Sequence, residues 1–338
     1  MPSEALVAIA EESARVEISG LWDTHQGVDG RFAARPEAKD RMRASSSRID
    51  ALPANAPAPR GPHPRTSGAT YAHDGTVEGL LSAVHDAFMA HDAAADILAA
   101  ANLQPRLGQT VVTVETSMEI ALKVRRLVEH DLGRRAFQCI LSAAAADDPA
   151  KGTAIYRFIR LGMAKAGTGS CTRCPKKATC TRACRAASGV KWMEDLAQPE
   201  VHAVVALYRS VVNERHLMLQ FMRFEHCEGD VWFARCNPKS SVVPLLMDWF
   251  IARFNDQRFV IYDEVHRVSG VYDGTGWYPV SGEEAVPPPH LEDERVMREA
   301  WQRFYRCIAI DARYNPELRR SFMPMRLWRN LPELEPNP

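Results

Sequence analysis

The sequence predicts an α+β fold with a helical N-terminal half, a central sheet unit and a C-terminal helix. Two apolar runs on either side of the turn at Glu228–Asp230 predict a β-hairpin. The stretch at 242–254 repeats apolar residues every three or four positions, as a helix packed on a sheet requires. Two β-rich runs follow, so the central unit is predicted to be strand, strand, helix, strand, strand.

The elements of this unit follow from local residue chemistry. They are predicted, in chain order, at His216–Phe224, Val231–Cys236, Val242–Phe254, Arg258–Tyr262 and Arg267–Tyr272. Pro244 falls in the first turn of the helix, where a missing N–H costs little. Because one helix covers one sheet face in such a unit, polar residues at strand ends stay available for binding or chemistry.

The N-terminal half is predicted to be mainly helical. An apolar stripe that includes Leu80 and Val84 predicts a helix after the Asp74–Thr76 turn, and Ser117 is suited to cap another. Predicted elements there are a strand at Thr110–Glu115 and helices at Ser117–Gly133, Arg134–Ala145, Thr153–Ala166 and Glu200–Val212. Beyond the central unit, a helix is predicted at 292–310, followed by an arginine-rich tail at 313–329.

The chain divides into three regions. Residues 1–70 are predicted to be a weakly ordered extension, with a short helix at Ser3–Ile18 and an extended linker where five prolines occur between Pro53 and Pro64. The folded domain is predicted at 71–332, with a cysteine-rich insert at 166–191, and 333–338 form a tail.

Composition indicates a globular cytoplasmic protein. The chain has 338 residues, of which 46% are hydrophobic, and no apolar run approaches the roughly 18 residues of a membrane span. Its N-terminus lacks the pattern of a secretory signal. The formal net charge is zero, so only local charge can indicate a nucleic-acid partner.

Four cysteines form the sharpest chemical signal in the chain. They are Cys171, Cys174, Cys180 and Cys184. Four thiolates so close together can surround one metal ion or cluster, and thiolates select zinc or iron–sulfur over hard cations. The compact spacing favours a [4Fe-4S] cluster, with zinc as the alternative, and free surface thiols are the remaining interpretation. The other four cysteines are expected to pack in the core.

The cysteine segment is also cationic. Its basic residues include Arg173, Lys176, Lys177, Arg182 and Arg185. These side chains either contact phosphates or offset the negative charge of a tetrathiolate site. Both interpretations stay open from the sequence.

Candidate catalytic residues lie around the central unit. Glu214 and His216 could form an acid–base couple, Arg223 follows on the predicted strand, and Asp263 ends the third strand. The alternative is structural: a capping glutamate, a structural histidine and an aspartate that makes a turn.

The C-terminal tail combines arginine with aromatic residues. Between 303 and 329 seven arginines stand against two acidic residues, interleaved with tyrosine, phenylalanine and tryptophan. This composition suits phosphate binding and base stacking, and the nucleic-acid candidates are Arg313, Arg319, Arg320 and Arg326. A solvated helix whose aromatic residues seal the core is the alternative.

Several motifs resemble a family of unknown biochemical function. They are Tyr71–Leu81, Ile155–Gly162, Glu214-x-His216, Phe221–Phe224, Pro244–Leu246, Phe250–Phe254, Ile261–Asp263, Ile308–Pro316 and Met323–Leu331. The family is described as DNA metabolism or DNA repair proteins. Its members resemble partners of a neighbouring radical-SAM protein, and a similar domain is fused to iron–sulfur uracil-DNA glycosylases.

The resemblance implies a role in DNA repair or modification beside a radical-SAM partner. It matches Glu214, His216, Arg223, Arg253 and Asp263 without assigning them roles. The insert at 166–191 departs from the common pattern, and no glycosylase domain is recognisable, so uracil excision does not carry over. Three hypotheses follow: a nucleic-acid-binding accessory protein, an enzyme acting on a damaged or modified base through His216 and a carboxylate, and a cluster-bearing interaction or electron-transfer module.

Overall fold

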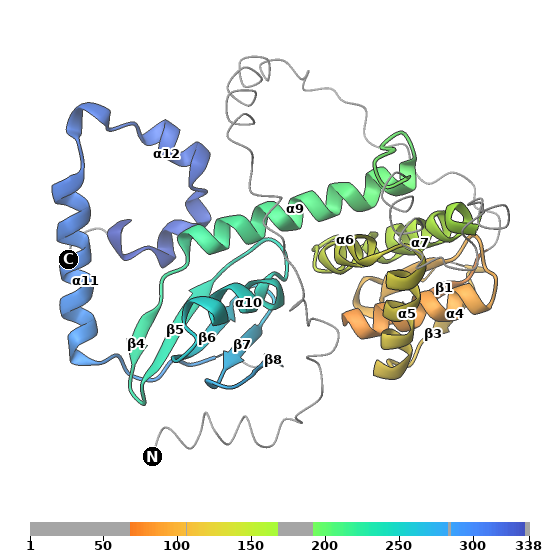
Figure 1. The fold of residues 1–338 in the computed structure, drawn as a ribbon, viewed down its shortest axis with the longest axis horizontal. Coiled ribbons are helices and arrows are strands. Elements are labelled where there is room, and N and C mark those ends of the chain that lie inside the picture. The colour runs from red at the N-terminus through yellow and green to blue at the C-terminus, as the bar shows by residue number, and fades with distance from the viewer. Residues whose placement is uncertain (1–67, 106, 168–191, 283–284, 335–338) are drawn as a thin grey trace, which may run out of the picture.

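The computed structural model describes residues 68–105, 107–167, 192–282 and 285–334. It shows an α+β protein, which confirms the predicted class, with two sheets connected by the long helix α9, Pro199–Phe221 (Figure 1). We call the described residues before α9 the N-lobe, and the five-stranded sheet with helix α10 the C-lobe. Most of the N-terminal extension and of the cysteine-rich insert lies outside the described residues.

The N-lobe contains a parallel sheet that the sequence did not predict in full. Its strands lie in the order β2-β1-β3, at Asp96–Ala99, Thr70–His73 and Val111–Thr113. Only the third was expected, because β1 and β2 are short and lack the alternating β-branched residues of Thr110–Glu115. Four helices pack with this sheet: α4 Val77–Met89, α5 Met118–Asp131, α6 Arg134–Ala144 and α7 Lys151–Gly167. A short 3-10 helix, η2, follows β2 at Ala100–Asn102.

Side-chain caps fix where two of these helices begin. The hydroxyl of Thr76 accepts a hydrogen bond from the Gly79 N–H at 3.0 Å, and the hydroxyl of Ser117 accepts one from the Ile120 N–H at 3.4 Å. Each cap satisfies a backbone donor that the first helical turn leaves unpaired. The predicted cap at Ser117 is therefore confirmed.

Helix α9 joins the cores of the two lobes. Val201 and Val204 belong to the N-lobe core, whereas Val211 and Met218 belong to the C-lobe core. The predicted strand at His216–Phe224 is wrong, because α9 continues to Phe221 and the first hairpin strand is only Glu225–Cys227. A short apolar run does not distinguish a strand from the end of a buried helix by periodicity.

The C-lobe sheet follows the order β4-β5-β6-β7-β8. Its elements are β4 Glu225–Cys227, β5 Val231–Cys236, α10 Val243–Arg253, β6 Arg258–Asp263, β7 Val268–Tyr272 and β8 Trp277–Ser281. Strands β5 and β6 are parallel and the other neighbours are antiparallel. Helix α10 lies so close to β7 that a Cβ on Gly270 would be 2.5 Å from the Met247 sulfur. The predicted unit from Val231 onward is confirmed, and β8 extends it.

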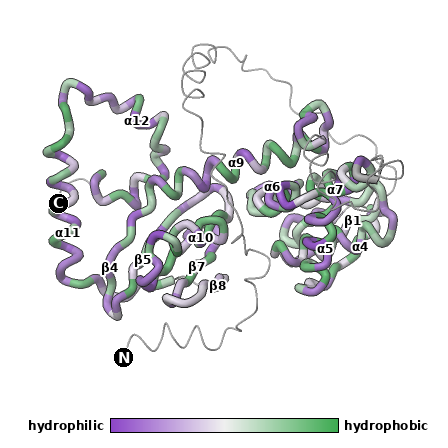
Figure 2. Tube along the Cα trace, in the orientation of Figure 1, coloured by the Kyte–Doolittle hydropathy of each residue, from purple (hydrophilic) through white to green (hydrophobic). Residues whose placement is uncertain are grey.

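The C-terminal segment runs along one side of the C-lobe (Figure 1). It consists of α11 Glu292–Ile308, η5 Asp311–Arg313, α12 Pro316–Phe322, η6 Met325–Asn330 and η7 Pro332–Leu334. Hydrophobic and hydrophilic residues mix along α11 (Figure 2), and none of its residues is buried in the described structure. Cys307 is therefore exposed, contrary to expectation, whereas Cys139, Cys227 and Cys236 are buried as expected.

Among the helices that the structure describes, none is both long and apolar enough to cross a membrane.

A buried histidine makes the N-lobe sensitive to acid. His73 lies at the end of β1, and its Nδ1 accepts a hydrogen bond from the Gly75 N–H at 3.1 Å. Burial lowers the pKa of His73, and Lys151 adds to this effect while Asp74 opposes it. The unfolded chain therefore takes up a proton at this residue at a higher pH than the folded protein does.

We predict that the free energy of unfolding falls as the pH drops below about 6.5, the ordinary pKa of histidine. The fall should continue until the pH reaches the lower pKa that His73 has in the folded protein. His73→Asn keeps a hydrogen-bond acceptor and should flatten this part of the curve. The exposed His202, changed to Asn, serves as the control. Urea unfolding between pH 5 and pH 8 measures the effect, and an unchanged slope in His73→Asn would contradict it.

Candidate functional site

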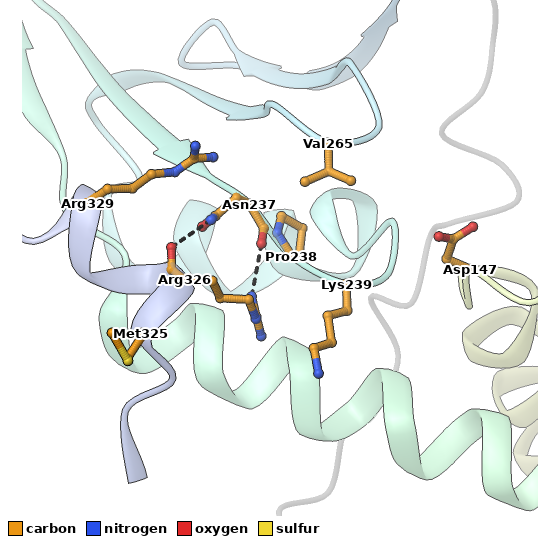
Figure 3. A pocket seen from close by; sticks show the side chains of 8 residues that line it. All are labelled: Asp147, Asn237, Pro238, Lys239, Val265, Met325, Arg326 and Arg329. Atoms are coloured by element: carbon orange, nitrogen blue, oxygen red, sulfur yellow. Dashed lines mark hydrogen bonds between the residues drawn. The ribbon is translucent and has the colours of Figure 1, made fainter. Parts of the chain in front are cut away.

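A cleft of about 570 Å³ opens where β5 and β6 end (Figure 3). It is lined by Asp147, Asn237, Pro238, Lys239, Val265, Met325, Arg326 and Arg329. Asp147 comes from the N-lobe, residues 237–239 follow β5, Val265 follows β6, and the last three come from η6. The carboxyl ends of parallel strands are frequent ligand sites, because connecting loops diverge there and leave room. Its volume is in the range of small-molecule sites.

Arg326 holds one wall of the cleft in place. Its Nη2 donates to Glu214 Oε2 at 2.7 Å and its Nη1 donates to the Asn237 carbonyl at 2.9 Å. The Asn237 side-chain amide donates in return to the Arg326 carbonyl at 2.7 Å (Figure 3). This reciprocal pair aligns η6 with the end of β5.

Glu214 completes this anchor from α9. Its second oxygen, Oε1, accepts the Lys239 backbone N–H at 2.9 Å, so one carboxylate binds both the turn after β5 and η6. The side chain is 6% exposed. A buried carboxylate needs such partners because leaving it unpaired costs several kcal/mol. We call Glu214, Asn237 and Arg326 the anchor triad.

Most of the cations that line the cleft are paired with carboxylates. Lys239 is exposed, and its ammonium forms no ion pair within the described residues. The Arg329 side chain is 58% exposed and binds Glu264, which also lies 3.6 Å from Arg235. Asp147 is the acidic side chain among the lining residues, against three cations. Because Glu214 pairs with Arg326 and Glu264 pairs with Arg329, Lys239 is the lining cation that stays available to an anionic group, such as a phosphate or carboxylate, within the described residues.

Asp263 lies behind this cleft and is fully buried. Its Oδ1 accepts the N–H groups of Val265 and His266 at 2.9 and 3.1 Å, and its Oδ2 lies 2.6 Å from His266 Nδ1. The Nε2 of His266 is buried without a partner among the described residues. The aspartate thus forms the turn after β6, as the structural alternative expected, and also contacts His266; its catalytic role stays a prediction.

The neighbouring thiol is inert. Cys236 pairs with Asp263 in the β5–β6 ladder, and its Sγ lies 3.4 Å from the Tyr262 carbonyl. Burial raises the pKa of Cys236 well above its ordinary value, and Asp263 and Glu264 raise it further. The thiolate form of Cys236 is therefore disfavoured, as is typical of a cysteine that packs in a core.

The expected acid–base couple of Glu214 and His216 does not form. Both residues lie on α9, and a spacing of two places their side chains on different sides of the helix. His216 is exposed, and its Nε2 accepts from the Gln220 side-chain amide at 2.7 Å. The structure corrects the pairing because it replaces the predicted strand with a helix.

Arg223 is a structural contact in the described residues. Its Nη2 donates to Glu333 Oε1 at 2.6 Å, and its guanidinium lies 5.9 Å from the centre of the Trp301 ring. Burial would raise the pKa of Glu333, but hydrogen bonds from Arg223 and Trp301 outweigh it and hold this pKa below its usual value. The charged pair attaches α11 to η7 and to the end of α9.

The predicted nucleic-acid residues of the C-terminal segment fall into two groups. Arg326, whose side chain is 22% exposed, belongs to the anchor triad, so it differs from the expected surface contact. The Arg319 guanidinium lies 4.7 Å from the Trp328 ring centre and 5.9 Å from that of Tyr314. Arg313 and Arg320 are exposed.

The predicted metal site lies outside the described residues. This applies to the ligands Cys171, Cys174, Cys180 and Cys184 and to the cations Arg173, Lys176, Lys177, Arg182 and Arg185. Within the parts of the chain that the structure describes, no group of three histidine, cysteine, aspartate or glutamate side chains could hold a metal ion.

Sequence reasoning missed the residues that complete the cleft. Asn237, Lys239 and Arg329 were not singled out, nor was Asp147. An Asn-Pro-Lys sequence directly after a predicted strand was a usable signal, because polar residues at strand ends often line sites. Nothing local marks Asp147, which the fold brings in from the other lobe.

Fold and site together define an α+β protein with a polar cleft at the carboxyl ends of two parallel strands. A family model for DUF4130, a domain of unknown function, matches residues 149–333, and the chain belongs to this family. The match runs from the start of α7 through the C-lobe and includes every cleft residue except Asp147. Neither a curated protein nor a solved structure matches the chain.

We predict that Glu214→Gln lowers the free energy of unfolding by about 2 kcal/mol, because it leaves the largely buried Arg326 without a counter-charge. Glu299→Gln is the control, since Glu299 pairs with Arg295 on an exposed helix face and should cost less than about 0.5 kcal/mol. In a double-mutant cycle with Arg326→Gln, urea unfolding should give a coupling energy above about 1 kcal/mol. If Glu214→Gln and Glu299→Gln lowered the free energy of unfolding equally, the buried pair of Glu214 and Arg326 would contribute no more than the exposed one.

Proposed function

We propose that this protein is a DNA repair or modification accessory protein that binds nucleic acid and works with a radical-SAM partner. The observation that carries the nucleic-acid part is the exposed combination of arginine and aromatic side chains on the C-terminal segment. The partner and the repair context rest on the family resemblance of the sequence motifs.

The C-terminal segment presents both components that a nucleic-acid strand needs. Tyr314 and Phe322 are each 70% exposed, which is a large exposed fraction for aromatic rings. Arg313 and Arg320 are exposed near them in sequence and form no ion pair within the described residues. Guanidinium groups bind phosphates and exposed rings stack on unpaired bases. This favours single-stranded or locally opened DNA.

The cleft and the exposed arginines draw on neighbouring elements of the C-terminal segment. Helix η6 supplies three cleft residues and directly follows α12, which carries Arg319 and Arg320. A strand bound along α12 could therefore place a phosphate or a displaced nucleotide near Lys239 and Arg329. The cleft volume supports this, because it suits a small ligand rather than a duplex.

The exposed apolar face of α11 supports a protein partner. Val296, Met297, Phe304 and Ile308 are each more than half exposed on this helix. Monomeric proteins seldom leave such a face uncovered. We propose that this face of α11 binds the radical-SAM protein that the resemblance implies. The cysteine-rich insert is proposed to hold an iron–sulfur cluster or, alternatively, zinc.

A second candidate function is an enzyme that acts on a damaged or modified nucleobase. The specific observation is the pair of Asp263 and His266, in which a buried carboxylate orients an imidazole whose Nε2 has no partner among the described residues. Such a histidine can act as a general base. Val265, in the same turn, lines the cleft. The sequence predicted His216 as the acting histidine of such an enzyme, and in this second candidate function His266 takes that role.

We predict that the protein binds single-stranded DNA with an affinity that falls steeply as salt rises. Arg313→Ala/Arg320→Ala should weaken binding and make the slope of log K against log salt less negative by about 1.4. Each lost contact to a single strand contributes about 0.7 to this slope. Fluorescence anisotropy with a labelled oligonucleotide measures both quantities. Arg209→Ala, on the exposed side of α9, is the matched control. Absence of binding by the unaltered protein at low salt would refute the proposal.

We predict that protein purified without oxygen carries a [4Fe-4S] cluster, with visible charge-transfer absorption and about four iron atoms per chain. Cys174→Ser should abolish the absorption because it removes one of four thiolate ligands. Cys307→Ser changes an exposed cysteine outside the insert and should leave it intact. A colourless protein with one zinc ion would instead support the zinc alternative.

A further inference from the structure

We propose that an apolar groove on the N-lobe is a docking site for Ser3–Ile18 of the same chain. The groove lies between α4, α5 and α7, away from the cleft, and has a volume of about 510 Å³. This inference goes beyond the proposed function and does not depend on it.

The groove is built from side chains that would otherwise belong in a core. Ile159 and Met163 of α7 line it, together with Phe88, Met89 and Leu127, of which the last three are exposed. A contiguous apolar surface of this kind is typical of a groove that receives the apolar face of a helix.

The rim of the groove is cationic. Lys123 and Arg126 line it, are exposed, and form no ion pair in the described part of the chain. The two other polar lining residues are His85 and His130, each of which lies beside an acid, at 3.1 Å from Asp86 and 2.8 Å from Asp131. The unpaired charges of the groove are therefore positive and favour an acidic occupant.

The point where the chain enters the described structure lies close to the groove. The Ala69 N–H donates to Asp92 Oδ2 at 2.8 Å, and Asp92 comes three residues after Met89, at the end of α4 that forms the groove. The preceding 67 residues therefore join the N-lobe beside this end of α4. A tether of this length can reach any part of the groove at high local concentration.

Ser3–Ile18 has the matching chemistry. Leu6, Ile9 and Val16 recur at spacings that place them on one face of a helix, and the segment carries Glu4, Glu11, Glu12 and Glu17 against one arginine. Residues 168–191, which follow α7, are less suitable because they are strongly basic and would be repelled by Lys123 and Arg126. Shape and charge thus both select the acidic N-terminal segment.

Hydrogen exchange of the full-length chain tests this docking. Leu6→Asp/Ile9→Asp should speed exchange of the α4 and α5 amides that face the groove, while α10 amides are unaffected. The expected change is about tenfold, for a tethered segment at a local concentration of roughly 1 mM and a Kd of roughly 0.1 mM. Because the substitutions lie outside the two lobes, they do not disturb the core. Identical exchange in both proteins would overturn the proposal.

Reversing the charges of both partners tests whether the glutamates of Ser3–Ile18 contact the cations at the rim of the groove. Glu11→Lys/Glu12→Lys and Lys123→Glu/Arg126→Glu should each speed exchange at the groove, and their combination should restore protection. Failure of the combination to restore it would overturn the pairing. Light scattering of the unaltered protein separates docking within one chain from exchange between two copies. A dimer that Leu6→Asp/Ile9→Asp converts to a monomer would overturn the intramolecular assignment.

Discussion

The buried carboxylate of Glu214 is the interaction on which the arrangement of the C-lobe depends. It binds the backbone after β5 and the guanidinium of Arg326 at once, and Asn237 closes the triad through the Arg326 carbonyl. These contacts bring together α9, the end of the parallel strand pair and a segment more than a hundred residues away in sequence. Helix α11 buries no residue of its own, so within the C-terminal segment the core contact of Leu327 in η6 is supplemented by such polar attachments.

This mode of attachment explains how one segment can support both shape and binding. Arg326 and Arg223 are held by Glu214 and Glu333, and they fix the path of the chain. Other arginines, including Arg313 and Arg320, stay exposed beside aromatic rings and are available to a polyanion. The C-terminal segment thus contains an arginine with a structural contact, Arg326, and exposed arginines that we propose as DNA contacts, Arg313 and Arg320. The net charge of the whole chain is zero, so this local separation, not the overall charge, supports the proposed DNA contact.

The sequence predicted the fold class and most helices, because their apolar periodicity is strong and Ser117 marks a start. It failed where local pattern and tertiary environment conflict. The apolar run after His216 belongs to α9, since its residues pack against the C-lobe core in helical geometry. Strands β1 and β2 are short and lack alternating β-branched residues. At the site, Glu214, Asp263 and Arg326 were predicted as candidate residues, but the contact between Glu214 and Arg326 could not be predicted, because 112 residues separate them in the sequence.

The central claim is that the anchor triad positions the C-terminal segment so that its exposed arginines can bind nucleic acid. The most direct test is the affinity of Glu214→Gln for single-stranded DNA, measured at low temperature and neutral pH where the variant is folded. Removing a negative charge should by itself strengthen binding to a polyanion. If the triad positions the segment, the variant instead binds more weakly than the unaltered protein. Equal or tighter binding by Glu214→Gln would contradict the account.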